Sequence, residues 1–160
     1  MKLDKILVPL DGSMLAEAAL SAACDFAERD GATISLLRAA EAMTLPGGDT
    51  VDAQVAAIRE AEEYLASVVR RLEDKGVRRV ETHVWYGPPA AAIVEAAATQ
   101  KADLIVMSTH GRSGLGRLVL GSVAESVLRG TTVPILIVRA GHAPVDAPRG
   151  ASDAKGAARV

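Results

Sequence analysis

The fold is decided by the stretch Leu104-Ile-Val-Met-Ser-Thr-His-Gly-Arg-Ser-Gly-Leu-Gly-Arg-Leu-Val-Leu-Gly-Ser122. Its apolar start predicts a buried strand, and its glycine-rich turn leads into a helical pattern from Val123 to Leu128. Because glycine has no Cβ, backbone N–H groups in such a turn can surround an anion at the start of a helix. Turns of this kind also serve as plain connections in α/β proteins, so spacing alone leaves both interpretations open.

Two common phosphate-binding motifs do not fit this stretch. Gly111-x4-Gly116 has the glycine spacing of a P-loop, but Arg117 and Leu118 stand where a lysine and a Ser or Thr belong. The dinucleotide fingerprint G-x-G-x-x-G fails because Val119 occupies its last glycine position. A third pattern does fit. Ser108-x2-Gly111-x9-Gly121-Ser122 resembles the G-x2-G-x9-G-[ST] signature of the universal stress protein family, in its nucleotide-binding branch.

The resemblance extends over most of the chain. It runs from Lys5-Ile-Leu-Val-Pro-Leu-Asp-Gly-Ser13 to Val133-Pro-Ile-Leu-Ile-Val-Arg139, and it departs from the signature at Ser108, which replaces the first glycine. It implies a single doubly wound, Rossmann-like (flavodoxin-like) α/β domain over residues 1–140, with a five-stranded, mostly parallel sheet in the order 3-2-1-4-5. Residues 141–160 lack apolar periodicity, which predicts a disordered tail.

The hydrophobic pattern supports the same fold class without the resemblance. Short apolar runs alternate with helical patterns, and this alternation is typical of a mostly parallel sheet covered on both faces. The first helix is predicted to lie on the sheet by an apolar stripe of Leu15, Ala19, Ala22 and Phe26. Strands are predicted at 5–10, 32–38, 79–85, 102–107 and 134–138, and the later helices at 51–75, 90–99 and 123–130.

The implied strand order places the predicted binding site. The order reverses between the first and fourth strands, so the loops that follow Leu10 and Met107 would flank one crevice. The resemblance implies that a nucleotide lies there, with its phosphates against the glycine loop and its adenosine towards the first two strands. Asp11 would lie on the adenosine side, although a carboxylate after a strand is more often a helix N-cap or a turn residue. The predicted cofactor-binding residues are Pro9, Leu10, Asp11, Ala39, Met107, Ser108, His110, Gly111, Arg112, Gly121, Ser122 and Val123.

The same residues predict binding without efficient catalysis. No general base is evident in the predicted cradle and the P-loop lysine is missing, so we expect slow or no turnover of ATP and no catalytic residue. The 3 histidines show no metal-ligand spacing, which predicts no metal site built by the protein. Mg²⁺ or Mn²⁺ would be held mainly by the nucleotide phosphates.

The amino-acid composition limits the kinds of partner and the cellular compartment that we expect for this chain. A net charge of -2 and 2% aromatic residues argue against binding to nucleic acid. Cys24 has no second cysteine to pair with and is predicted to be a buried core thiol. The chain shows neither a signal-peptide pattern nor an apolar run of membrane-spanning length, so we expect no membrane association and a cytoplasmic protein.

These features predict an ATP-binding stress or signalling module that acts on a protein partner of unknown identity. Two alternatives stay open, a nucleotide-free dimeric scaffold and a slow ATP hydrolase. The run from Val133 to Val138 is apolar at almost every position and lies at a sheet edge in the implied order. An uncovered apolar edge strand tends to pair with another strand. The resemblance implies a homodimer joined edge to edge through this strand, and we expect one here.

Overall fold

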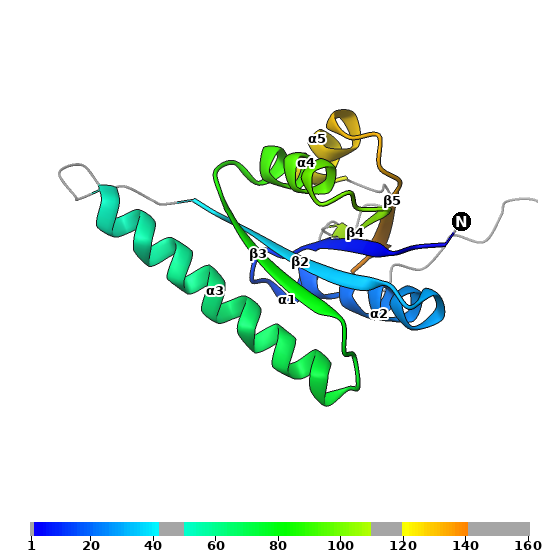
Figure 1. The fold of residues 1–160 in the computed structure, drawn as a ribbon. Helices are drawn as coiled ribbons and strands as arrows, with labels where there is room; N and C mark the ends of the chain where they lie inside the picture. The colour runs from blue at the N-terminus through cyan, green and yellow to red at the C-terminus, as the bar shows by residue number, and fades with distance from the viewer. Residues whose placement is uncertain (1, 42–49, 110–119, 141–160) are drawn as a thin grey trace, which may run out of the picture.

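The computed structural model describes residues 2–41, 50–109 and 120–140 (Figure 1). Within these ranges the chain forms one parallel sheet in the order β3-β2-β1-β4-β5, which confirms the predicted order and fold class. The strands are β1 (Lys5–Pro9), β2 (Thr33–Ala40), β3 (Val80–Tyr86), β4 (Leu104–Thr109) and β5 (Ile135–Arg139). The helices are α1 (Met14–Glu17), α2 (Ala19–Asp30), α3 (Thr50–Asp74), α4 (Pro89–Thr99) and α5 (Ser122–Gly130).

Helices cover the sheet on both faces. Figure 1 shows α1, α2 and α3 on one face and α4 and α5 on the other. Alternate residues of each inner strand therefore point into two different cores. On β1, Ile6 and Val8 belong to the core beneath α2 and α3, whereas Leu7 belongs to the core beneath α4. All three side chains are fully buried, as expected for a central parallel strand.

The first helical segment differs from the prediction. A single helix packed by Leu15, Ala19, Ala22 and Phe26 was expected, but Ala18 separates α1 from α2. The N–H of Ala18 donates to the carbonyl of Leu15 at 3.2 Å, three residues back, which tightens the turn at this point. The fully buried residues of α2 are Ala19, Ala23 and Ala27. Their spacing of four places small side chains at the centre of the contact with β1 and β4, while Leu20 and Phe26 pack at its margin.

Helix α3 has two unlike halves. Its second half packs on β2 and β3 through a buried stripe of Ala61, Leu65, Val68 and Leu72. Residues 50–60 include no buried residue, and Val51 and Val55 are 64% and 51% exposed. Figure 1 shows this half projecting past the end of the sheet. The fully buried residues of α3 therefore all lie in its second half.

The boundaries of the remaining elements follow local chemistry. Gly31 ends α2 in a left-handed conformation with φ 72°, which glycine adopts without a steric penalty.

Both β3 and β5 are edge strands, as predicted for each. None of the helices in the described ranges combines the length and the apolar character needed to cross a membrane. The predicted tail at 141–160 lies outside the described residues.

Candidate functional site

The reversal of strand order lies between β1 and β4. Ile6 pairs with Leu104 and Leu7 with Ile105, and the chain winds outward from this pair in both directions. The segment after β1 continues into α1 on one face of the sheet, and the segment after β4 leads to α5 on the other. Parallel α/β sheets bind ligands at this position, because the diverging connections leave a crevice at the carboxyl ends of the strands.

A hollow of about 450 Å³ occupies this position. Its volume lies within the range of about 300–1,000 Å³ that is usual for small-molecule sites. The structure brings together here the predicted residues Pro9, Leu10, Asp11, Ala39, Met107, Ser108, Gly121, Ser122 and Val123. The other three predicted residues, His110, Gly111 and Arg112, lie outside the described part of the chain.

The sequence interpretation missed five residues that line this hollow. They are Ala16, Leu37, Pro89, Ile93 and Ala124. Leu37 could have been found, because it lies two residues before Ala39 and therefore on the same side of β2. Pro89 and Ile93 belong to α4, and no local pattern shows that this helix reaches the end of β4.

The turn after β1 holds the acidic side of the hollow. The Ser13 N–H donates to Asp11 Oδ1 at 2.8 Å, and the Ala16 N–H donates to Ser13 Oγ at 3.1 Å. Ser13 is therefore the N-cap of α1, while Asp11 stabilises the turn that precedes it. Gly12 between them has φ +87°, a conformation that strains any side chain.

The N-terminus of α5 forms the opposite side. Its N-cap is Gly121, which has φ -61° and ψ 154° and makes no side-chain capping bond. The first backbone N–H groups of a helix have no partner within the helix, so those of Ser122 and Val123 favour a negatively charged group. Ser108 fits at the edge of this side without backbone strain, because Lys101 is the one non-glycine residue with positive φ in the described ranges.

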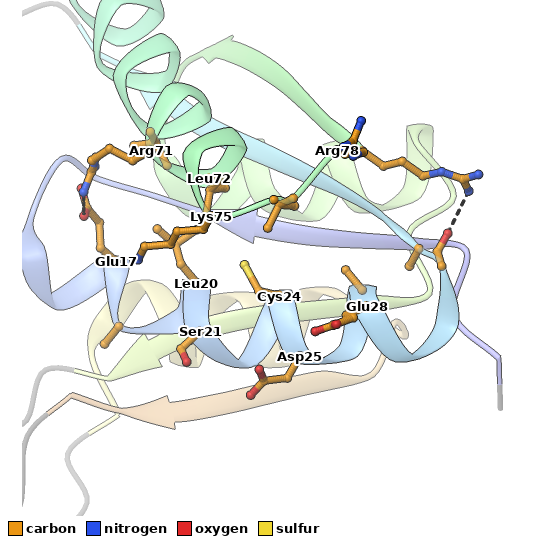
Figure 2. A pocket seen from close by; sticks show the side chains of 18 residues that line it. Glu17, Leu20, Ser21, Cys24, Asp25, Glu28, Arg71, Leu72, Lys75 and Arg78 are labelled. Atoms are coloured by element: carbon orange, nitrogen blue, oxygen red, sulfur yellow. Dashed lines mark hydrogen bonds and ion pairs between the residues drawn. The ribbon is translucent and has the colours of Figure 1, made fainter.

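A second hollow, of about 630 Å³, lies between α2 and the end of α3 (Figure 2). Leu20 and Cys24 point from α2 towards Leu72 on α3, and charged side chains surround them. Cys24 is half-buried and packs against the core beneath α2 and α3, so the thiol predicted for the core lies at the margin of that core. Burial raises the pKa of its thiol above the ordinary value, which lowers its reactivity at neutral pH.

Ion pairs close one end of this second hollow. Arg71 donates to Glu17 with Nη1 at 2.8 Å and Nη2 at 2.9 Å, and the Tyr64 hydroxyl donates to the same carboxylate at 2.9 Å. The hydrogen bond from Arg71 lowers the pKa of Glu17, whereas burial raises the pKa of Tyr64. These groups satisfy one another and fix α1 against α3. We therefore assign them a structural role.

Metal-ligating side chains do not cluster in the part of the chain that the structure describes: no group of three or more His, Cys, Asp or Glu residues converges there. Asp11 is the one ionisable residue among those that line the hollow at the strand reversal. That hollow therefore offers apolar walls, one carboxylate and the amide end of a helix. Such a surface suits a ligand with a flat apolar part and an anionic part.

Comparison with known proteins establishes the family. The model of the universal stress protein family matches residues 2–139. The chain belongs to the universal stress protein family. The resemblance that the signature Ser108-x2-Gly111-x9-Gly121-Ser122 indicated is thereby confirmed. The match spans every strand and helix described above.

Three relatives illustrate the relationship of this universal stress protein to others. Universal stress protein MJ0531 of Methanocaldococcus jannaschii is 35% identical over 139 residues, or 84% of this chain and 81% of the relative. The solved structure of the protein MJ0577 superposes with a TM-score of 0.73 at 28% identity, covering 89% of this chain and 100% of that one. A universal stress protein solved in complex with cAMP gives a TM-score of 0.58 at 26% identity, with coverage of 88% and 100%.

Proposed function

We propose that this universal stress protein binds ATP in the hollow at the strand reversal and acts as a stress-response or signalling module with little or no turnover. The observation that carries the proposal is the convergence of Asp11, Ala39, Ser108 and Gly121 on one hollow of about 450 Å³. These residues come from four separate parts of the chain. A family member solved in complex with cAMP supports an adenine nucleotide as the ligand class.

The lining suggests how the nucleotide would lie. The base would fit the apolar wall between Leu37, Ile93 and Met107, which are all almost fully buried. The phosphates would face the first N–H groups of α5, where Gly121 leaves room for a close approach. The signature residues Gly111 and Arg112 would complete the phosphate side, and any Mg²⁺ or Mn²⁺ would be held by phosphate oxygens.

Titration calorimetry with ATP tests the proposal directly. The protein is first freed of co-purified nucleotide, and heat is then measured up to high micromolar ATP. We expect saturable binding by the wild type and none by Gly121→Val, because a branched side chain fills the space for the phosphates. The φ of -61° suits valine, so the variant should keep its fold, and Gly121→Ala is the matched control. Absence of heat with the wild type contradicts ATP binding.

Two other functions give different results in simple measurements. A nucleotide-free dimeric scaffold would purify without adenine, whose absorbance is strong against 1 Trp and 2 Tyr. A slow ATP hydrolase would release phosphate faster than the Gly121→Val variant. We place binding first because the described lining offers no evident general base beside the amide end of α5.

The proposal includes a homodimer joined through β5 in the cytoplasm. The apolar residues from Ile135 to Val138 are all partly exposed at the sheet edge, where a strand from a second copy would cover them. The single cysteine requires no oxidising compartment. Light scattering at micromolar protein should give twice the mass of 16.6 kDa, and a monomeric mass contradicts the dimer.

A further inference from the structure

The guanidinium group of Arg38 lies beneath the turn that carries Asp11. Arg38 precedes Ala39 on β2, so its side chain leaves the opposite face of the sheet from the one that Ala39 presents to the hollow. A Cβ placed on Gly12 would overlap Nη1 of Arg38 and would lie 3.3 Å from its Cζ. The flat guanidinium group thus contacts the backbone of Gly12, the residue between Asp11 and the N-cap Ser13.

The burial of this charge is poorly compensated by other contacts. The Arg38 side chain is 17% exposed, and its one ion pair within the described ranges is a 3.5 Å contact from Nη2 to Glu60, which is 78% exposed. Its Cζ lies 4.9 Å from the centre of the Tyr64 ring. Its Nη1 is buried and has no hydrogen-bond partner among the described residues. Among the described residues, the charge is therefore compensated by one long ion pair and one cation–π contact.

We propose that Arg38 is a positioning residue for the nucleotide site: its guanidinium group supports Gly12 from below and so holds Asp11 at the rim of the hollow. The argument rests on the proposed function and adds to it a residue that does not line the site. The contact is made by the Nη1 edge of the guanidinium group and needs a residue without a Cβ, which explains why arginine and glycine meet here. The Tyr64 ring lies against the same guanidinium group and is itself fixed by the bond from its hydroxyl to Glu17.

The test compares Arg38→Met with the wild type in two measurements. Hydrogen exchange over residues 10–17 should become faster, because the bonds of Ser13 and Ala16 open more often when the turn loses its support. Affinity for adenosine and for ATP should fall by the same factor, about tenfold, as is typical when a residue that orients a binding group is lost. Binding is measured well below the melting temperature, where a loss of global stability alone leaves affinity unchanged.

Two variants serve as matched controls. Arg59→Met and Arg70→Met each remove an exposed arginine of α3. Both should leave the exchange of residues 10–17 and both affinities unchanged. If Arg38→Met does not fold, Arg38→Lys is used instead, because lysine keeps the charge but lacks the planar group.

Each possible result of these measurements supports or overturns the proposed role of Arg38. Unchanged exchange and affinity in a folded Arg38 variant would overturn it. A loss that is larger for ATP than for adenosine would also overturn it, since Arg38 would then act as a counter-charge to phosphate. If the wild type binds neither ligand, the proposed function fails, and the exchange of residues 10–17 alone decides whether Arg38 supports the turn.

Discussion

Asp30 connects the start of the chain to the end of α2. Its Oδ2 accepts the N–H of Leu3 at 3.0 Å, and Arg29 donates to both of its oxygens. The hydrogen bond from Arg29, with that from the Leu3 amide, lowers the pKa of Asp30 from 3.8 to about 2. The folded state therefore favours the charged carboxylate, so this contribution to stability is present above the unfolded pKa and is lost as the pH falls from about 4 to about 2.

The variant Asp30→Asn tests the direction in which the stabilisation by Asp30 changes with pH. The wild type should exceed the variant in free energy of unfolding by a constant amount at neutral and weakly acidic pH, and the difference should shrink as the pH falls from about 4 to about 2. Urea unfolding at a series of pH values measures it. A difference that grows on acidification would contradict the assignment. Asp25→Asn, on the exposed side of α2, is the control for the loss of one charge.

At the scale of elements, the two halves of α3 should differ in local stability. Residues 61–74 include the buried stripe of the helix, whereas residues 50–60 bury nothing. Helices in proteins are held mainly by their packed face, so the first half should open without the second. Hydrogen exchange should show faster exchange of amides 54–60 than of amides 65–72. Equal protection along the whole helix would show that a further contact holds the first half.

The two edge strands should also differ. If β5 pairs with β5 of a second copy, its outward-facing amides are protected only in the dimer, and their exchange should quicken on dilution. Strand β3 is the internal control, because it lies at the other edge and carries the charged residue Glu81, which disfavours pairing. Exchange in β5 that does not depend on concentration would argue against a dimer through this strand.

At the scale of the whole molecule, nucleotide binding should stabilise the domain against heat. A ligand at about 100 times its Kd stabilises the folded state by about 2.7 kcal/mol. For a chain of this size, that corresponds to a rise in Tm of about 5–10 °C. A thermal scan with and without ATP measures the rise, and Gly121→Val should show none. An equal rise in the variant would mean that ATP binds elsewhere.

The fold class, the strand order implied by the family resemblance and most of the lining of the hollow could be predicted from the sequence. Apolar runs such as Leu104–Met107 favour strands that are covered on both faces, because both of their faces are apolar. The signature around Gly121 and the carboxylate of Asp11 both follow strands, and parallel strands end at one edge. Local pattern placed each of these residues at the end of a strand, and the strand order implied by the family resemblance made them neighbours.

Only the tertiary structure decided which side chains meet across elements. The orientation of α2 about its own axis buries Ala19, Ala23 and Ala27 and places Cys24 beside a surface hollow. Helix α4 places Ile93 in the lining of the hollow at the strand reversal, and the side chain of Arg38 contacts Gly12. Periodicity fixes which face of an element is apolar, but how closely and at what rotation two elements pack depends on all the side chains between them.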